Sequence, residues 1–268
     1  MTPPAAKTER YLAVTQKVVN FAIMDVKAEK IMPYGRGRGK SEEVRDMFDS
    51  IAPAYDFMNR AMTLGIDRLW RRRAVRAVAS VSPRRVLDIA TGTGDMAIAL
   101  ARRIPGASIE GIDLSAGMVE IGRRKVSEAG LNGRVDLRIG DSLAIDLPDA
   151  SVDAITVAYG VRNFEHLDRG YAEMMRVLRP GGLLAVLELS TPRGRLTAPL
   201  YRLYTRYVIP AAGRLISRDS RAYSYLPESI AAVPQGDDMC ALILAAGASR
   251  AEARPMTFGA CTLYLARK

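Results

Sequence analysis

The sequence predicts a doubly wound α/β fold with a mostly parallel β-sheet. Two observations predict it. From residue 85 onward, short apolar segments typical of strands alternate with longer segments of helical periodicity. The first of these strands leads directly into a glycine-rich turn, as in many nucleotide-binding α/β proteins. The chain has 268 residues, of which 49% are hydrophobic, so it is long enough to bury such a sheet between layers of helices.

The composition excludes several other classes of protein. Charged residues make up 25% of the chain, and no run of about 18 uncharged apolar residues occurs, which excludes disordered, fibrous and multi-span membrane proteins. The two cysteines, Cys240 and Cys261, are expected to be buried, reduced thiols. The first residues lack the features of a signal peptide and Met24 offers an alternative start, so we expect a cytoplasmic location.

The part of the chain before the sheet is expected to divide in two. Residues 1–40 carry a Pro-Pro pair and a Gly/Arg run, so they are interpreted as a peripheral N-terminal extension. Residues 41–82 are expected to form a helical cap. Ser41 is predicted to cap a helix that runs through Phe48. A second helix over 66–79 is predicted to have one arginine-rich face and one apolar face, the latter made by Ile66, Leu69, Trp70, Ala74, Val75 and Val78.

The remaining elements follow in a regular β-α order within a single domain over 41–268. The strands expected from the apolar pattern are 86–90, 108–113, 135–141, 153–159, 183–190 and 258–267. The helices expected between them are 95–103, 115–129, 167–178 and 237–246. The third of these helices should stop at the Pro-Gly-Gly sequence of 180–182. Residues 191–234 form an insert of different composition before the last elements.

Charge is distributed unevenly along the chain. The formal net charge is +10, and a strongly basic protein favours anionic partners such as nucleic acid or acidic lipid. Residues 190–221 contain seven arginines and three tyrosines against one acid. The insert is therefore the expected location of such a contact.

The sharpest local signal is the glycine turn after the first strand. Gly92 and Gly94 remove side chains where the backbone must turn tightly and approach a ligand. Asp113, at the end of the second strand, is placed to accept hydrogen bonds from both hydroxyls of a ribose. Ala97 completes a G-x-G-x-x-A pattern, so a dinucleotide site is an alternative.

Three features favour S-adenosylmethionine (SAM) over a dinucleotide. Asp88 and Asp95 flank the turn with negative charge, which suits the ammonium and sulfonium groups of SAM and opposes a pyrophosphate. Asp141 and Ser142 follow the third strand, where they can reach an adenine amino group. Little chain remains after residue 190 for the separate substrate domain of a dehydrogenase.

Several longer motifs resemble one family. The matching stretches are FDSIAPAYDFMN (48–59), LGIDRLWR (64–71), VLDIATGTGD (86–95), YGVRNF (159–164), MMRVLRPGGLLAVLELSTP (174–192) and SYLPES (224–229). Over residues 41–268 the chain resembles the ubiquinone/menaquinone biosynthesis C-methyltransferases, with the demethylmenaquinone methyltransferases the most similar branch. The resemblance implies a class I SAM-dependent methyltransferase fold, Rossmann-like and seven-stranded. Residues 237–256 depart from the usual pattern of the family.

The resemblance also implies the cofactor contacts and the reaction. SAM contacts fall on Thr93, Asp113, Asp141 and Ser142, and Ala158 stands where the family often has serine. The reaction implied is methyl transfer to a ring carbon of demethylmenaquinol, the last step of menaquinone biosynthesis, and no metal is needed. C-methylation of a benzoquinol of the ubiquinone pathway is an alternative that these motifs do not separate.

Catalytic candidates lie at the carboxyl edge of the sheet and on the helical cap. Arg162 is expected to stabilise a phenolate or orient a water, beside Asn163, or else to form a surface salt bridge. Tyr55 and Asp56 should close over the site, where Asp56 either takes a proton or acts as a helix cap. The lone His166 is interpreted as structural, and Tyr159 as core packing or pocket lining.

The insert has two interpretations. Leu200, Leu203, Tyr204 and Tyr207 fall on one helical face, as in a helix lying on anionic lipid, and a polyprenyl substrate would explain such a contact on the inner face of the membrane. A lid helix packed on the domain is the alternative, and Pro210 with Gly213 should prevent one straight helix.

Three other functions compete with the quinol methyltransferase. An RNA methyltransferase would require a recognisable RNA-binding module, which the sequence lacks, so no nucleic-acid partner is expected. An NAD-dependent oxidoreductase and a non-catalytic membrane-peripheral subunit are the others. The sequence does not indicate an oligomeric state.

Overall fold

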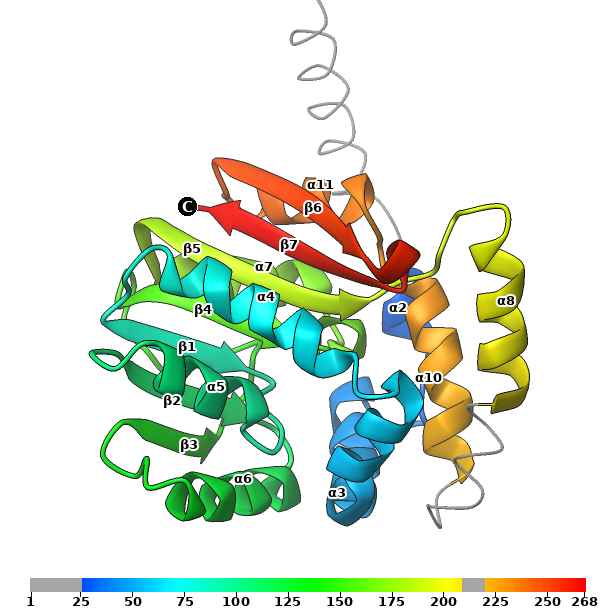
Figure 1. Cartoon of the computed structure of the whole chain (residues 1–268), viewed down its shortest axis with the longest axis horizontal. Helices are drawn as coiled ribbons and strands as arrows, with labels where there is room; N and C mark the ends of the chain where they lie inside the picture. The colour runs from blue at the N-terminus through cyan, green and yellow to red at the C-terminus, as the bar shows by residue number, and fades with distance from the viewer. Residues whose placement is uncertain (1–25, 209–219) are drawn as a thin grey trace, which may run out of the picture.

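The computed structural model describes residues 26–208 and 220–268 and has a seven-stranded sheet at its centre (Figure 1). The strands are β1 (Arg85–Ile89), β2 (Ser108–Asp113), β3 (Val135–Ile139), β4 (Val152–Ala158), β5 (Leu178–Leu189), β6 (Arg250–Met256) and β7 (Cys261–Arg267). Their order is β3-β2-β1-β4-β5-β7-β6, and only β7 runs against its neighbours. The predicted doubly wound, mostly parallel sheet is confirmed.

Helices cover both faces of the sheet because side chains of each strand alternate between two cores. Val86 packs with α4 (Asp67–Ala79), α5 (Asp95–Arg103) and α6 (Ala116–Glu128), whereas Leu87 and Ile89 pack with α7 (Leu167–Val177) and α11 (Asp237–Ala245). The chain reverses its direction across the sheet between β1 and β4, so a crevice opens at the carboxyl ends of these strands.

Most predicted element boundaries agree with the structure, but strand β6 was not among the predicted strands, and four predicted features differ. Helix α3 (Lys40–Thr63) has Gly39 at its N-cap position, and Ser41 does not cap it. The carboxylate of Glu165 instead accepts the first N–H groups of that helix, from Lys40 and Ser41, each at 3.2 Å. A side chain distant in sequence therefore replaces the local cap, and the helix extends far beyond Phe48.

The other three differences concern exposure and strand ends. Ile66 and Leu69 are exposed and do not belong to the buried face of α4. Strand β5 begins at Leu178, five residues before the predicted start. Val152 of β4 pairs with Leu178 and Ala154 pairs with Leu183, so residues 179–182 form a bulge between the two pairs. Residues 258–260 are not in the last strand. Phe258 lies in the short helix η3 (Thr257–Gly259) with a φ of 56°.

Residues 26–40 pack against the domain instead of lying apart from it as a peripheral extension. Val26, at the N-cap position of the short helix α2 (Lys27–Lys30), and Ala28 within that helix belong to the core with α7 and α11. The buried carboxylate of Glu43 accepts three backbone N–H groups, from Tyr34, Gly35 and Arg36. The folded domain therefore begins before residue 41.

The insert contributes helix α8 (Thr197–Leu203), the short π-helix η2 (Tyr204–Val208) and helix α10 (Ser220–Ala232). With α3, these helices lie beyond the carboxyl ends of the parallel strands (Figure 1). The Tyr204 hydroxyl donates a hydrogen bond to the carbonyl oxygen of Met62 at the end of α3. The predicted helix breakers Pro210 and Gly213 lie outside the described residues.

Two expectations from composition can be compared with the structure. Cys240 and Cys261 are buried and free, as predicted, and burial raises the pKa of the Cys240 thiol to about 11. In the part of the chain that the structure describes, no helix combines the length and apolar character needed to cross a bilayer.

Candidate active site

A cavity lies at the carboxyl ends of β1 to β4, and α3 forms its roof. Its lining comes from three sources: α3 with its first turn, the segments that follow β1, β2 and β3, and the loop after β4. The lining residues are Ser41, Val44, Arg45, Phe48, Tyr55, Ala90, Gly92, Ile112, Asp113, Leu114, Ser115, Met118, Gly140, Asp141, Ser142, Leu143, Ala158, Tyr159, Gly160, Asn163, Phe164 and Glu165. The cavity therefore occupies the crevice that the sheet topology creates.

The two glycines of the turn after β1 have different roles. Both adopt the left-handed conformation, with φ of 54° at Gly92 and 78° at Gly94. Gly92 lines the cavity, and a side chain there would point towards the ring of Tyr55, whose Cε1 atom lies 3.9 Å from the Cβ position. A Cβ atom on Gly94 would lie 2.9 Å from Leu137, so this glycine is required for packing of α5 and does not line the cavity.

Asp113 connects the glycine turn to the start of α6. One carboxylate oxygen accepts the N–H of Gly92 at 2.8 Å, and the other accepts the N–H of Ser115 at 2.9 Å. Burial raises the pKa of Asp113, and these two N–H groups oppose the rise. Each oxygen retains a further lone pair, so the side chain can accept two more hydrogen bonds from a ligand in the cavity.

The turn after β3 supplies the far wall of the cavity. The Asp141 carboxylate accepts the N–H of Leu143 at 2.8 Å, which fixes the turn, and the Ser142 side chain is buried beside it. Ala158, at the end of β4, lines the cavity with a methyl group where a hydroxyl contact would need serine.

Asp88 is not among the residues that line the cavity. It is fully buried beneath the glycine turn, and its two oxygens accept the hydroxyls of Thr91 at 2.6 Å and Thr156 at 2.5 Å. Burial raises the pKa of Asp88 to about 6, with the two hydroxyls opposing the rise. Asp88 therefore shapes the turn, and the expected direct contact with a ligand is not supported.

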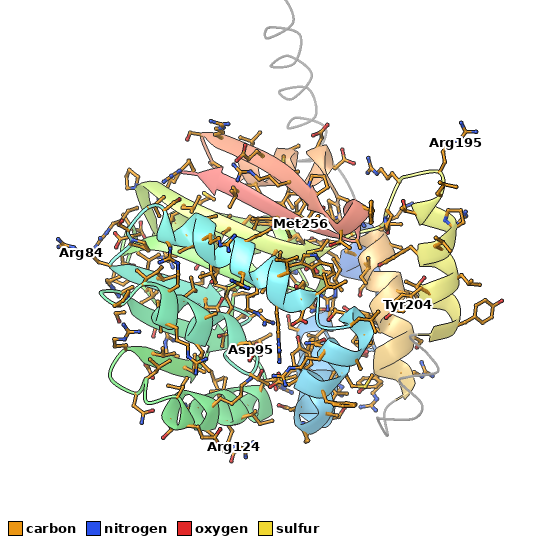
Figure 2. All side chains as sticks on the ribbon, in the orientation of Figure 1. Arg84, Asp95, Arg124, Arg195, Tyr204 and Met256 are labelled. Carbon is orange, nitrogen blue, oxygen red and sulfur yellow. The ribbon has the colours of Figure 1, made fainter. Side chains whose placement is uncertain are left out.

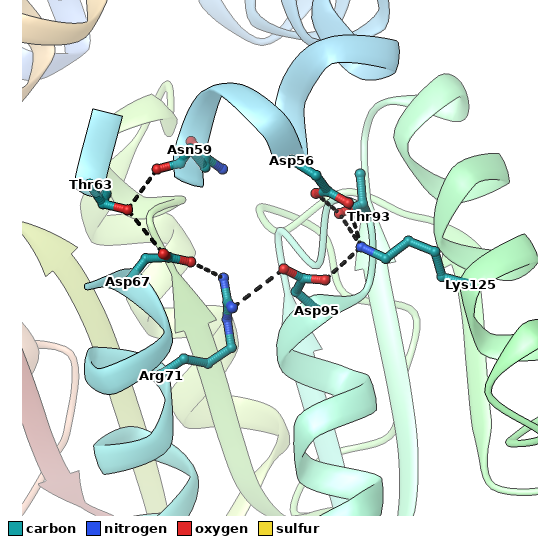
Figure 3. Close-up of polar contacts among 8 residues, drawn as sticks. All are labelled: Asp56, Asn59, Thr63, Asp67, Arg71, Thr93, Asp95 and Lys125. Carbon is teal, nitrogen blue, oxygen red and sulfur yellow. Dashed lines mark hydrogen bonds and ion pairs between the residues drawn. The ribbon is translucent and has the colours of Figure 1, made fainter. Parts of the chain in front are cut away.

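Asp95 and Asp56 belong to a polar network behind the cavity (Figure 3). The ammonium of Lys125, on α6, donates to Asp95 at 2.5 Å, to Asp56 at 2.6 Å and to Thr93 at 3.1 Å. The Thr93 hydroxyl also donates to Asp56 at 2.6 Å. Figure 3 shows the network continuing from Asp95 through Arg71 to Asp67, Thr63 and Asn59.

This network corrects two expectations. Burial raises the pKa of Asp95, but Arg71 and Lys125 outweigh this and hold it below its usual value. Two cationic partners within the protein therefore balance its negative charge, and the expected attraction of a cationic ligand gains no support from this geometry. Asp56 already pairs with Lys125 and Thr93 and is not among the cavity-lining residues, so it positions α3 on the glycine turn instead of taking a substrate proton.

Lys125→Met is expected to lower the free energy of unfolding by about 1–3 kcal/mol, because Asp56 and Asp95 lose their shared cation. Urea denaturation measures it. Arg124→Met is the matched control, since Arg124 is the preceding residue of α6 with a side chain 69% exposed, and a change within about 0.5 kcal/mol is expected there. Equal effects of the two substitutions would contradict a specific role for Lys125.

The loop after β4 carries a second group of polar residues, of which Asn163 lines the cavity whereas Arg162 is buried behind the lining. Arg162, in the short helix η1 (Val161–Asn163), forms a buried ion pair with Glu188 of β5, with Nη1 and Oε1 at 2.8 Å. The expected surface salt bridge is therefore a buried one. The guanidinium also donates to the carbonyl of Tyr159, and its Nε atom is buried without a partner among the described residues.

Asn163 follows Arg162 in η1, and Tyr55 comes from α3. Asn163 lines the cavity and accepts the hydroxyl of Tyr225, on α10, at 3.1 Å. Burial raises the pKa of Tyr55, while Asn59 and the charge of Arg162 oppose the rise. The cap, the insert and the loop after β4 thus converge on one end of the cavity.

Comparison with known proteins identifies the family. The model of the ubiE/COQ5 methyltransferase family matches residues 37–268. The chain belongs to this family. A demethylmenaquinone methyltransferase of Bacteroides fragilis is 46% identical over 245 residues, which span 91% of this chain and 100% of that protein. A ubiquinone/menaquinone biosynthesis C-methyltransferase of Geobacter sulfurreducens is 43% identical, covering 92% of this chain and 96% of its own.

A solved structure supports the fold. The SAM-dependent methyltransferase SibL superposes with a TM-score of 0.58 at 19% identity, over 77% of this chain and 56% of the longer SibL chain. Likeness at this identity concerns architecture alone. Together with membership of the ubiE/COQ5 methyltransferase family, it confirms the class I methyltransferase fold and SAM as the methyl donor.

The cavity of this ubiE/COQ5 methyltransferase is lined by groups that suit SAM. A backbone without a side chain at Gly92 and the carboxylates of Asp113 and Asp141 line one continuous surface. These are the groups that can bind the hydroxyls of a ribose and the amino group of an adenine. The predicted residues thus separate into Gly92, Asp113, Asp141, Ser142 and Ala158 on the cavity wall, and Asp88, Thr93 and Gly94 behind it.

Tyr159 and His166 complete the account of the predicted residues. Tyr159 lines the cavity with a φ of 60°, and its hydroxyl is buried without a partner among the described residues. His166 precedes α7 and is not a lining residue of the cavity. Beside it, Glu29 accepts the N–H of Leu167, which supports the structural interpretation of this region.

Sequence reasoning missed Lys40. Its side chain is 1% exposed, and its ammonium donates to three carbonyl oxygens, those of Ala28 at 2.6 Å, Arg162 at 3.0 Å and Phe164 at 3.2 Å. Lys40 therefore fixes the loop that carries Arg162 to the start of α3. Because lysine is rarely buried and the run around it is rich in glycine and arginine, no sequence signal marks this role.

The contribution of Lys40 to stability should depend on pH. Burial lowers its pKa to about 8, while Glu29 and Glu165 oppose the fall. Above pH 8 the folded protein releases this proton and the unfolded chain retains it up to about 10.5, so stability rises with pH in this window. The free energy of unfolding of wild type relative to Lys40→Met should rise by about 3 kcal/mol between pH 7 and 10.5. Urea titrations at several pH values measure this difference, and a constant difference would contradict the prediction.

Proposed function

We propose that this protein transfers the methyl group of SAM to a ring carbon of demethylmenaquinol and so forms menaquinol. The names of its relatives support a quinone acceptor. The observation that carries the proposal is the junction of two sites in one cavity. Asp113, Asp141 and Asn163 all line this cavity, and Asn163 directly follows the buried Arg162 in η1. A nucleoside-bearing methyl donor and an aromatic acceptor can therefore meet there.

The nucleoside part of the donor has proposed protein partners. Asp113 would bind the ribose hydroxyls, and Asp141 with Ser142 would bind the adenine, while Ala158 contributes only packing and backbone. Gly92 permits close approach of the chain, and Asp88, Thr93 and Gly94 hold the turn in shape. When bound, SAM supplies an electrophilic methyl group on a positively charged sulfur.

Residues of the second group would activate and align the acceptor. A ring carbon becomes a good nucleophile only after the neighbouring hydroxyl loses its proton. Because an ordinary phenol has a pKa of about 10, little of the anion is present at neutral pH. The cation of Arg162, just behind the cavity wall at Asn163, would lower the pKa of a phenol held there, and its unpartnered Nε–H would become a donor for the resulting oxygen anion if substrate binding exposed it. Tyr55 and Asn163 would hold the ring in line with the methyl group, and such alignment contributes about 7–11 kcal/mol in favourable cases.

Because the proposed substrate is a membrane lipid, we also propose where in the cell this protein works. A polyprenyl quinol resides in a bilayer, so we place this protein in the cytoplasm, peripherally on the inner face of the cell membrane. The insert supports this, since Leu200, Leu203 and Tyr207 are exposed, with 67%, 58% and 59% of their surfaces accessible. Tyr204 does not point outwards with these residues. Its hydroxyl donates to the carbonyl of Met62 on α3, which is the kind of contact expected of a lid packed on the domain.

The test is methyl transfer from isotope-labelled SAM to a short-tailed demethylmenaquinone, with and without a reductant, with products identified by mass spectrometry. We expect label on the naphthoquinone ring only under reducing conditions. A benzoquinol acceptor is run in parallel, because relatives named for both pathways match this chain. No transfer to the naphthoquinol, by a protein that binds SAM, would overturn the proposal.

A further inference from the structure

A groove on the surface between α4 and α5 is lined by seven arginines and one acid. Six of the arginines are exposed, and Arg71 lies at the base with Asp95. We call this surface the arginine groove. Its exposed arginines are Arg60, Arg68, Arg72, Arg76, Arg102 and Arg103. None of these residues lines the cavity of the candidate active site.

Among residues 26–208 and 220–268, carboxylates neutralise only Arg71 of the arginine groove. Arg71 pairs with Asp67 at 3.4 Å and with Asp95 at 3.3 Å. For the six exposed arginines, no carboxylate of the described residues lies within ion-pair distance. Folding does not explain this arrangement either, since α4 attaches to the domain through its opposite, apolar face. Converging like charges repel one another and favour an anionic partner.

Apolar side chains border the arginine groove at the corner where α3 joins α4. Leu64 is 82% exposed, and Phe57 and Leu69 are exposed on either side of it in sequence. The hydrogen bond of Tyr204 to Met62 brings the insert to the same corner. Guanidinium groups that bind phosphates, next to exposed aliphatic side chains, are typical of a surface that lies on a lipid headgroup layer.

We propose that the arginine groove binds the phosphates of an anionic lipid bilayer and, together with the corner at Leu64, sets the side of the molecule that faces the membrane. The proposal rests on the proposed function in one respect, namely that the substrate is drawn from a bilayer. It adds to the insert a second contact on a different part of the fold. RNA fits less well, because binding to single strands relies on aromatic platforms and the arginine groove contains none.

The experiment is co-sedimentation of the full chain with vesicles of phosphatidylglycerol and phosphatidylcholine, compared with vesicles of phosphatidylcholine alone. The variant Arg68→Gln/Arg72→Gln/Arg76→Gln removes three charges from the arginine groove. The matched control Arg124→Gln/Arg250→Gln/Arg254→Gln removes three exposed charges elsewhere, on α6 and β6. Figure 2 shows Arg124 at the far edge of the molecule, beyond α6. The two variants have equal net charge.

We expect wild type to bind the anionic vesicles and to dissociate as salt is raised. Each basic residue at a membrane surface changes affinity about fivefold, so the groove variant should bind on the order of 100-fold more weakly. The control variant should bind as wild type does. Equal losses in both variants, or no loss in the groove variant, would overturn the proposal. Groove-dependent binding of polyuridylate in place of vesicles would also overturn it in favour of nucleic acid.

A second readout separates this proposal from the proposed function. Methyl transfer to a short-tailed acceptor in detergent micelles should be the same in wild type and the groove variant, because these arginines lie outside the active-site cavity. With acceptor embedded in anionic vesicles, the groove variant alone should be slow. If wild type binds vesicles but transfers no methyl group in micelles, the proposed function is wrong, whereas the proposed membrane-binding surface is retained.

Discussion

Asp113→Asn is expected to weaken the binding of SAM by at least ~100-fold, since a charged acceptor of two hydroxyls contributes about 1.5–3 kcal/mol per hydrogen bond. The amide also leaves either Gly92 or Ser115 without its present acceptor, so the glycine turn loses part of its support. Isothermal titration calorimetry with SAM measures the dissociation constant. The effect should appear in KM for SAM more than in kcat at saturating donor.

Asp88→Asn is the matched control, because this acid precedes the same turn but lies beneath it. The dissociation constant for SAM should stay within a few-fold of the wild-type value. The pKa of about 6 means that the folded protein binds a proton here that the unfolded chain, near 3.8, does not. The contribution of Asp88 to stability therefore falls as pH rises from about 4 to 6, and the asparagine should remove this fall. A large loss of SAM affinity in Asp88→Asn would contradict the assignment of the two acids.

The contrast between Asp113 and Asp88 illustrates what the sequence can predict. Strand periodicity and glycine spacing predicted the turn, and the position of Asp113 at the end of β2 placed it on the cavity wall. These features are local, or depend on strand ends that meet at one edge of a parallel sheet. Asp88 and Asp95 were correctly predicted to lie beside the turn. The sequence did not predict that both side chains point away from the cavity.

The electrostatics of the turn depend on partners that the sequence does not reveal. Asp95 is neutralised by Lys125 from α6 and Arg71 from α4, and Asp56 shares the same ammonium. The cap of α3 is likewise provided by Glu165 and not by the nearby Ser41. Hydrogen-bonding side chains that arrive from other elements can displace a local pattern, and only the packed structure identifies them.

Arg162→Met is expected to have the largest effect of all on stability and activity together. Arg162 and Glu188 are 6% and 1% exposed, and removing one member of a buried ion pair costs about 3–5 kcal/mol because the other charge is left unpaired. Burial alone would lower the pKa of Arg162, but Glu188 outweighs it and raises the pKa, so the side chain is cationic at all working pH values. Urea denaturation measures the loss. Arg250→Met, from the exposed pair with Glu252, is the control and should cost less than about 1 kcal/mol.

The loss of activity in Arg162→Met alone could follow from misfolding, so the double variant Arg162→Met/Glu188→Gln separates the two effects. It leaves no buried charge unpaired, and most of the lost stability should return. Methyl transfer should not return, because the cation and the Nε–H donor for the phenolate are both absent. Removal of one such donor typically lowers kcat by ~10²–10³, with little change in KM for SAM.

The pH dependence of kcat supplies the last discrimination. If Arg162 lowers the pKa of the acceptor hydroxyl, its loss shifts the rising limb of the kcat profile towards higher pH, since more hydroxide is needed to form the phenolate. Arg162→Lys retains a positive charge and N–H donors, so its profile should be shifted less than that of Arg162→Met. A double variant that is stable and transfers methyl at the wild-type rate, with an unshifted profile, would reduce Arg162 to a structural partner of Glu188. A stable double variant with a shifted profile assigns the cation to the chemical step itself.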